Sequence, residues 1–473
     1  MPMRLFNTLS RSVEEFVPLD AAGRLVRIYC CGPTVYDFGH IGNFRTFVFS
    51  DLVRRCLQFR GYEVTSVMNI TDVEDKIIQR VREARTTLRE YVSKFEQAFL
   101  EDMQSLGCLP AHHLPRATEH IPEMMRLIEA LMKRGIAYQA ADKSIYFSIE
   151  KYQGCGCRYG QLVHLNFEQM RMGARVASDE YTKDALADFA LWKARVPEDG
   201  DVFWPSPWGE GRPGWHIECS AMSMKLLGPS FDLHLGGEDL VFPHHEDEIA
   251  QSEGAGVQAP GQRFVKYWLH AAHLLVEGRK MSKSAGNFFT VRDLLAKGYG
   301  GRELRYLLIS THYRETFNFT LDGLDGGRQA IGRLDECLGK LEETAGGPAE
   351  AAPPDAGLLN AFVALLDEDL NMAGAWGVVF EWVRQLNRLM AANQLTAAQA
   401  AAALATWQEL DRVLGLGRKQ GSQAPPDILA LLEERQSARR ARDFKKADQL
   451  RDQLKSKGWL IEDTPKGAKL KRV

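Results

Sequence analysis

A short apolar run followed by a glycine-containing loop and a helical pattern most constrains the fold of this chain. Residues 25–29 have the length and composition of a buried strand, and they run into the loop Cys-Cys-Gly-Pro-Thr. Apolar residues then recur near every fourth position from Phe44 to Phe59, which predicts a helix. A second strand is predicted over residues 63–70. The order strand, loop, helix and strand is typical of a parallel α/β sheet.

The length of 473 residues predicts several domains rather than one core. We expect a Rossmann-like catalytic domain in two halves, over residues 1–115 and 206–275, with an inserted α/β module over 116–205. A region over 276–343 follows, and then an α-helical bundle over 355–416 and a small C-terminal domain over 422–473. Linkers rich in Gly, Pro, Ala or Ser separate the last three parts. The alanine-rich stretch 397–405 is expected to be a surface helix.

Charge and hydropathy exclude several classes of protein. No apolar run approaches the roughly 20 residues that cross a bilayer. Residues 1–20 lack the apolar core of a secretion signal, so we expect a cytoplasmic protein without a membrane segment. The net charge of -3 gives no global signal for nucleic-acid binding. Residues 435–473 carry 13 Lys or Arg against 5 Asp or Glu, which fits a nucleic-acid surface and equally a solvated helical tail.

Two short motifs carry phosphate chemistry. The string CGPTVYDFGHIGN, residues 31–43, takes a strand into a loop and a helix, where backbone N–H groups can bind an anion. His40 can donate to a phosphate oxygen there, although a tight turn with a buried histidine fits equally well. The string KMSKS, residues 280–284, places two lysines between Gly278 and Gly286. Such a loop can close over a triphosphate and neutralise the pyrophosphate leaving group. Either motif alone is weak evidence, but the pair is specific.

This pair resembles the HIGH and KMSKS signatures of class I aminoacyl-tRNA synthetases. The strings CGPTVYD, GWHIECSAM, FPHHEDEIAQSE and KMSKSAGNFFTVRDLL are similar to the cysteinyl-tRNA synthetase family, as is the C-terminal ARDFKKADQLRDQLKSKGWLIEDTPKG. The resemblance implies ATP-dependent activation of L-cysteine and its transfer to the 3′ end of tRNA(Cys), with Mg²⁺ accompanying ATP. We expect the chain to act as a monomer. Asn43 replaces the second histidine of the signature, and Glu74 stands where Asp is expected.

The resemblance points to Cys31, Cys219, His244 and Glu248 as the ligands of one zinc ion. Thiolate, imidazole and carboxylate are all ordinary zinc ligands. His244 and Glu248 lie four residues apart, so one helical face presents both. Both cysteines can reach the crevice at the carboxyl ends of parallel strands. Zinc binds a thiolate much better than a neutral hydroxyl, and apolar pockets separate the two poorly. Zinc is therefore expected to distinguish cysteine from serine.

Other metal-binding side chains compete with this set. The eight cysteines contain no CxxC pair, so a metal site must join distant parts of the chain. Cys30 points away from Cys31 if both lie in a strand. His245 lies off the face that His244 and Glu248 share, so we expect it beside the ligands. The remaining cysteines considered are expected in the core or in ordinary structural or surface positions: Cys56, Cys337, Cys155 and Cys157.

The resemblance also assigns further site residues. Catalytic roles fall to four residues: His40, Asn43, Lys280 and Lys283. The ATP site is expected to include His40, Gly42, Asn43, Lys283 and Asp239. The cysteine pocket is expected to include Thr34, Trp215 and His234. For His216 and His234, a role as hydrogen-bond donors and a role as neutral packed histidines are equally open.

Two other functions remain open. A paralogous ligase that joins cysteine to an amino sugar would share the catalytic core and the zinc site, but it would lack a tRNA-reading C-terminus. A non-catalytic tRNA-binding paralogue is supported only by Asn43. The basic C-terminus argues against the first, and the intact KMSKS argues against the second. We expect residues 422–473 to read the anticodon end of tRNA, with Trp459 either packed or available for base stacking.

Overall fold

The computed structural model describes residues 2–163, 188–282, 286–346, 352–417, 426–464 and 467–472. The chain forms two compact units, Met1–Leu416 and Gly417–Val473. Among the described residues, no helix combines the length and the apolar character needed to cross a bilayer.

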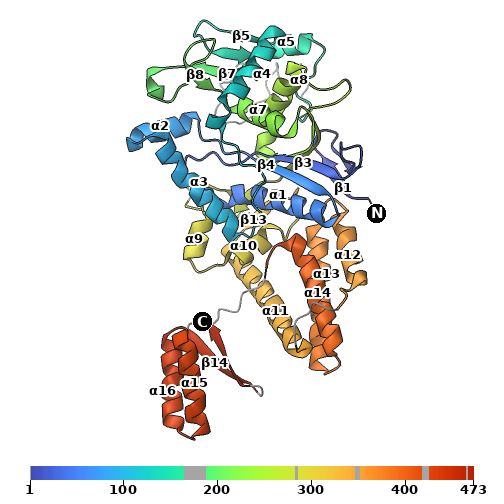
Figure 1. Ribbon diagram of the computed structural model, residues 1–473, viewed down its shortest axis with the longest axis vertical. Helices are drawn as coiled ribbons and strands as arrows, with labels where there is room; N and C mark the ends of the chain where they lie inside the picture. The colour runs from blue at the N-terminus through green and yellow to red at the C-terminus, as the bar shows by residue number, and fades with distance from the viewer. Residues whose placement is uncertain are drawn as a thin grey trace. The chain divides into compact units, whose positions relative to one another are not determined.

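A parallel sheet in the order β10-β9-β3-β4 forms the centre of the first unit (Figure 1). Its strands are β3 (Leu25–Cys30), β4 (Glu63–Met68), β9 (Phe231–Gly237) and β10 (Val265–Ala271). Helix α1 (Ile41–Phe59) joins β3 to β4, so the predicted parallel α/β class is confirmed. Strand β3 pairs with β4 on one side and with β9 on the other. The carboxyl end of β3 is therefore a switch point, where open α/β sheets bind their ligands.

Successive side chains of β3 enter two different hydrophobic cores. Ile28 and Cys30 pack in the core that includes α1, whereas Tyr29 and Cys31 pack in the core that the inserted module shares. This alternation is the ordinary geometry of a strand. It confirms the prediction that Cys30 and Cys31 point in opposite directions.

The inserted module carries an antiparallel sheet in the order β5-β6-β7-β8. Its elements are α4 (Ile121–Lys133), β5 (Ala137–Gln139), β6 (Ile145–Phe147), α5 (Ile149–Gly154), β7 (Phe189–Ala194) and β8 (Gly211–Pro213). Helices α2 (Asp75–Ala84) and α3 (Leu88–Ser105) precede it. Apolar side chains of the module share one core with α7 (Trp215–Leu227) and α8 (Glu246–Ala255). The module is therefore built against two helices of the central fold (Figure 1).

Two small sheets flank the central one. Strands β1 (Arg4–Asn7) and β2 (Ser12–Glu15) form a hairpin. Strand β11 (Leu274–Val276) lies between β12 (Arg279–Lys280) and β13 (Phe317–Phe319). The helices after β12 are α9 (Val291–Ala296), α10 (Gly301–Leu308), α11 (Leu321–Ala345), α12 (Ala356–Leu366), α13 (Met372–Ala391) and α14 (Ala397–Leu414).

Helix α14 corrects the prediction of a surface helix over residues 397–405. Ala400, Ala403 and Leu404 are buried, and the helix packs against α11. A run of alanines presents no polar face, and its small side chains allow close approach to a neighbouring helix. The alanine-rich pattern alone therefore does not separate a surface helix from a packed one.

The second unit contains two helices and a hairpin. They are α15 (Pro426–Arg440), α16 (Phe444–Ser456), β14 (Trp459–Thr464) and β15 (Gly467–Arg472). Trp459 is buried with Ile428 and Leu454, which confirms the packed interpretation of this tryptophan. The aromatic side chain that this unit exposes is Phe444, at 63% of its surface.

Candidate functional site

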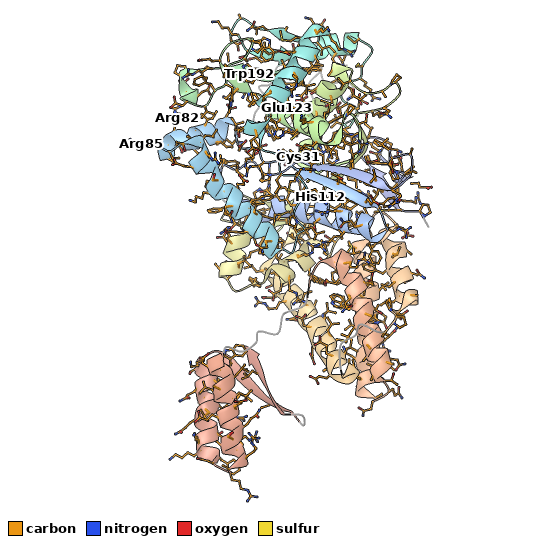
Figure 2. All side chains as sticks on the ribbon, viewed as in Figure 1. Cys31, Arg82, Arg85, His112, Glu123 and Trp192 are labelled. Carbon is orange, nitrogen blue, oxygen red and sulfur yellow. The ribbon has the colours of Figure 1, made fainter. Side chains whose placement is uncertain are left out.

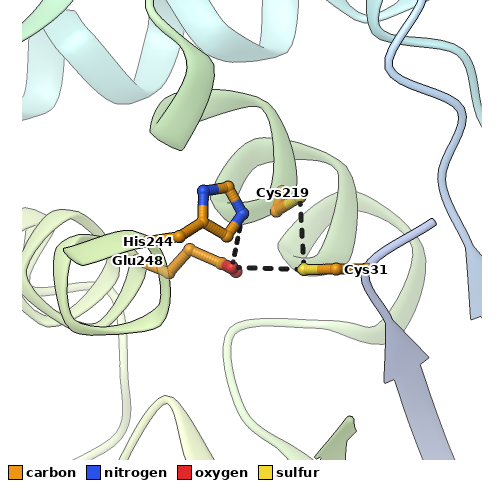
Figure 3. A group of neighbouring side chains, drawn as sticks. All are labelled: Cys31, Cys219, His244 and Glu248. Carbon is orange, nitrogen blue, oxygen red and sulfur yellow. Dashed lines mark hydrogen bonds and ion pairs between the residues drawn. The ribbon is translucent and has the colours of Figure 1, made fainter. Parts of the chain in front are cut away.

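Four side chains with metal-binding chemistry meet near the carboxyl end of β3. Cys31 directly follows β3, and Figure 2 places it below the inserted module that carries Trp192. Cys219 comes from α7. His244 comes from a π-helical turn, Val241–His245, and Glu248 from the first turn of α8. One ligand atom from each residue lies within 4.8 Å of all the others (Figure 3).

The separations of these atoms fit one tetrahedral ion. Sγ of Cys31 lies 3.8 Å from Sγ of Cys219 and 3.6 Å from Oε1 of Glu248. Nε2 of His244 lies 3.2 Å from the same oxygen. Zinc bonds of about 2.3 Å to sulfur and about 2.0–2.2 Å to nitrogen or oxygen imply tetrahedral edges of about 3.8, 3.6 and 3.4 Å for these three pairs. The four residues therefore match such an ion in donor chemistry and in size.

Burial makes this cluster unfavourable without a cation. All four side chains are at most 5% exposed. Removal from water raises the pKa of the Cys31 thiol and of the Glu248 carboxyl well above their ordinary values, and it lowers the pKa of His244 well below its ordinary value. Two thiols and a carboxyl packed together would therefore stay neutral on their own. A divalent cation reverses this preference and stabilises the anionic ligands.

Three more histidines surround the four candidate ligands. Nδ1 of His216 lies 2.9 Å from Nδ1 of His244, and Nε2 of His234 lies 3.0 Å from Oε2 of Glu248. His234 is fully buried, so it contacts the candidate ligands from behind rather than lining an open pocket. Nε2 of His245 lies 3.4 Å from Sγ of Cys31, closer than its position off the ligand face suggested.

A second ligand set is geometrically possible. Cys31, His234, His245 and Glu248 also bring one ligand atom each within 4.8 Å of the others. This set contains one thiolate, whereas the set with Cys219 contains two. Because sulfur ligands favour zinc over harder cations, the set with two thiolates is the better zinc site.

The HIGN motif caps helix α1. His40 is the N-cap, and its Nδ1 accepts from the backbone N–H of Asn43 at 3.2 Å. The side-chain oxygen of Asn43 accepts from the backbone N–H of His40 at 3.1 Å. This reciprocal pair is a capping box, in which Asn43 supplies the acceptor that Glu or Gln usually supplies. A side chain at Gly42 would crowd the His40 ring and Met281, which explains the glycine at this position.

Burial lowers the pKa of His40, while the nearby carboxylate of Asp239 acts in the opposite direction. Asp239 is exposed in the turn after β9. A side chain at Gly237 would overlap its carboxylate and would approach Thr46 of α1. Asp239 therefore lies near the N-terminal half of α1, on the side where ATP is expected.

Residues on both sides of the KMSKS string lie against the HIGN motif. The backbone N–H of Ile41 donates to Phe289 at 3.0 Å, and the His40 ring packs edge-on against Phe288. The side chain of Asn287 bonds the backbone of Ser282 at 2.9 Å and of Lys280 at 3.2 Å. Lys280 is exposed in β12. The predicted residue Lys283 lies outside the described residues.

Trp215, at the start of α7, lies beside the candidate metal ligands. Its ring centroid is 4.3 Å from that of His244. A cavity of about 470 Å³ opens next to it, lined also by His216 and by Lys193 and Arg212 of the inserted module. Thr34 lies in the loop after β3, where it pairs with Thr71.

Sequence reasoning missed a polar chain below this loop. The backbone N–H of Gly32 donates to Asn69, the Asn69 amide donates to Thr71, and the Thr71 hydroxyl donates to Glu218, at 2.9, 3.1 and 3.0 Å. Burial raises the pKa of Glu218 well above its ordinary value. The available signal was the polar string Asn69-Ile-Thr71-Asp, which directly follows the predicted strand that became β4.

Solved structures with the same fold are aminoacyl-tRNA synthetases. The methionyl-tRNA synthetase of Mycobacterium tuberculosis in complex with methionyl-adenylate is similar over 83% of this chain and 90% of its own, with a TM-score of 0.59 and 15% identity. A putative arginyl-tRNA synthetase from Campylobacter jejuni is similar over 83% and 91%, with a TM-score of 0.53 and 13% identity. With the HIGN and KMSKS segments joined at α1, this fold defines a class I aminoacyl-tRNA synthetase.

Sequence comparison identifies the family within this class. Models match a class I (C) tRNA synthetase catalytic domain over residues 17–328, a DALR domain over 361–418 and a cysteinyl-tRNA ligase anticodon binding domain over 422–469. The cysteine–tRNA ligase of Chlamydia muridarum is 45% identical over the full length of both chains. That of Protochlamydia amoebophila is 43% identical over 100% of this chain and 98% of its own. The chain belongs to the cysteine–tRNA ligase family.

Proposed function

We propose that the protein activates L-cysteine with ATP, releases pyrophosphate and transfers cysteine to the 3′ end of tRNA(Cys). The observation that carries this proposal is the buried cluster of Cys31, Cys219, His244 and Glu248 beside Trp215, in a chain that matches cysteine–tRNA ligases over its full length. We propose that the protein acts as a cytoplasmic monomer and uses Mg²⁺ with ATP.

Selection of the substrate needs a group that separates a thiol from a hydroxyl. Cysteine and serine differ by one atom, and an apolar pocket rejects such an analogue by only about a hundredfold. A zinc ion held by the four candidate ligands would supply a Lewis acid that prefers a thiolate and lowers the thiol pKa. Trp215 lies against His244, so it is well placed to form a wall of the same pocket. Thr34 and the neighbouring Thr71 lie in the loops at the sheet edge.

Adenylate formation needs positioning and charge rather than a side-chain nucleophile. The cysteine carboxylate attacks the α-phosphorus of ATP, and pyrophosphate leaves. His40 and Asn43, at the N-terminus of α1, are proposed to contact the phosphates, with Gly42 giving close backbone approach. Asp239 is proposed to accept from the ATP ribose or from the substrate amino group. Lys280 and Lys283 are proposed to neutralise the charge that develops on pyrophosphate.

Transfer to tRNA distinguishes this proposal from the amino-sugar ligase. The match to an anticodon binding domain over residues 422–469 supports tRNA as the acceptor. ATP–pyrophosphate exchange with cysteine tests the first step, and charging of tRNA(Cys) tests the second. Exchange without tRNA charging, together with transfer to an amino sugar, would contradict the proposal. Absence of exchange would instead favour the non-catalytic paralogue.

A further inference from the structure

A chain of buried side chains leads from His244 into the inserted module. Nδ1 of His244 lies 2.9 Å from Nδ1 of His216, and Nε2 of His216 lies 3.4 Å from Oδ2 of Asp247. The hydroxyl of Tyr159 donates to the other oxygen of Asp247. All four side chains are buried. We refer to His244, His216, Asp247 and Tyr159 as the module chain.

An ion bound at Nε2 of His244 would fix every proton along the module chain. A neutral imidazole that gives its Nε2 lone pair to a metal carries its proton on Nδ1. His244 then donates to Nδ1 of His216, which must carry its own proton on Nε2. That proton faces Asp247, and a carboxylate can only accept. The module chain therefore has one direction, and it ends on an acceptor that Tyr159 also stabilises.

Neighbouring Glu246 holds the same segment of the inserted module. Its carboxylate accepts from the backbone N–H groups of Gly160, Gln161 and Leu162 at 2.6, 2.8 and 2.8 Å. Glu246 and Asp247 are consecutive residues at the start of α8, two and three residues after His244. Residues 159–162 of the module are therefore tied to the element that carries His244 and Glu248.

The contacts of Cys31 run with the opposite polarity. Sγ of Cys31 lies 3.4 Å from Nε2 of His245, whose Nδ1 lies 2.7 Å from Nε2 of His270. Nδ1 of His270 lies 2.7 Å from the hydroxyl of Thr8. A thiolate accepts, so this series must end on a donor, and the Thr8 hydroxyl is one. Each candidate ligand thus has the hydrogen-bonding polarity that its metal-bound form requires.

We propose that His216, Asp247 and Tyr159 are positioning residues for His244, and that the inserted module thereby helps to build the thiol-selecting site. The inference rests on the proposed metal function, because it assumes an ion at Nε2 of His244. It goes further by assigning a role in metal affinity to Tyr159, a residue that lies outside the central fold and touches none of the candidate ligands' metal-facing atoms.

The substitution Asp247→Asn tests the direction of the module chain. An amide can donate to Nε2 of His216, which would reverse the chain and place the His244 proton on Nε2, where it blocks the metal. We expect zinc affinity to fall about 10–100-fold in the full-length protein, measured by competition with a chelator. The visible spectrum of the cobalt-substituted protein should also change. Tyr159→Phe should lower zinc affinity in the same direction by a smaller factor.

Tyr152→Phe is the matched control. Tyr152 is a buried tyrosine of the same module, and its hydroxyl has no hydrogen-bond partner among the described residues. Its substitution should leave zinc affinity and the cobalt spectrum unchanged. Wild-type zinc affinity and an unchanged cobalt spectrum in Asp247→Asn would overturn the inference alone. Equal losses in Tyr152→Phe and Tyr159→Phe would reduce it to a general packing effect and also overturn it. A wild-type protein that binds no zinc would overturn the metal assignment and this inference together.

Discussion

The two ends of the active site differ in their access to water. At the thiol end, Cys31, Cys219, His244 and Glu248 are at most 5% exposed, and buried histidines contact three of them. At the phosphate end, Asn43 and Lys280 are exposed. Selection gains from a dry, preset geometry, since electrostatic contacts strengthen there and need no reorganisation. Release of pyrophosphate instead needs charges that can meet solvent and then let the product leave.

The largest expected effect belongs to the phosphate end. Lys283→Ala should slow cysteine-dependent pyrophosphate exchange by about 10²–10³-fold, or about 2.7–4 kcal/mol, by analogy with the loss of one charge-stabilising donor. Cysteine binding should change little, because the leaving-group charge develops mainly in the transition state. The exchange rate constant and the KM for cysteine measure the two effects separately. Lys280→Ala is the matched variant and should lose less; near-normal exchange in Lys283→Ala would contradict the assignment.

The second unit should affect tRNA charging without affecting either end of the active site. Phe444 is exposed in a basic segment, between Arg442 and Lys445, where it can stack on a base. Phe444→Ala should raise the KM for tRNA by a factor that corresponds to about 1–3 kcal/mol, the typical value for one stacked base. Pyrophosphate exchange should stay unchanged. Leu460 is also exposed but has no aromatic ring, so Leu460→Ala is the control.

Removal of the whole second unit sharpens the same contrast. Truncation before Ser422 should spare exchange, raise the KM for tRNA and flatten the salt dependence of tRNA binding, because fewer phosphates are contacted. If the truncated protein charges tRNA as well as the intact protein at low tRNA concentration, residues 422–473 do not read the anticodon.

The smallest effect is expected at Asn43. Asn43→Ala removes one half of the capping box of α1, so it should lower the free energy of unfolding by about 1 kcal/mol or less. It should also slow exchange less than Lys283→Ala does. Gln399 occupies the same place in the capping box of α14, far along the chain from both motifs. Gln399→Ala should cost similar stability in denaturant unfolding with no change in exchange. Equal kinetics in the two variants would reduce Asn43 to a cap.

The sequence predicted those features that depend on local patterns. The strand before Cys31, the helix after His40 and the strand after it follow from hydrophobic spacing, and all three are present. The separation of Cys30 from Cys31 follows from the period of a strand. Features that depend on how distant segments pack were not predictable. The approach of His245 to Cys31 requires the π-helical turn before α8, and the contact of Tyr159 with Asp247 requires the inserted module to fold onto that helix.

Discrimination between cysteine and serine tests the proposed zinc site most directly. The kcat/KM for each amino acid in pyrophosphate exchange should be measured for the wild-type protein and for Cys219→Ser, together with their zinc content. We predict one zinc per wild-type chain and strong preference for cysteine. We predict that Cys219→Ser loses zinc, raises the KM for cysteine and narrows the preference, while the KM for ATP stays near its wild-type value. Unchanged zinc content and unchanged discrimination in Cys219→Ser would contradict the assignment of Cys31, Cys219, His244 and Glu248 as the thiol-selecting site.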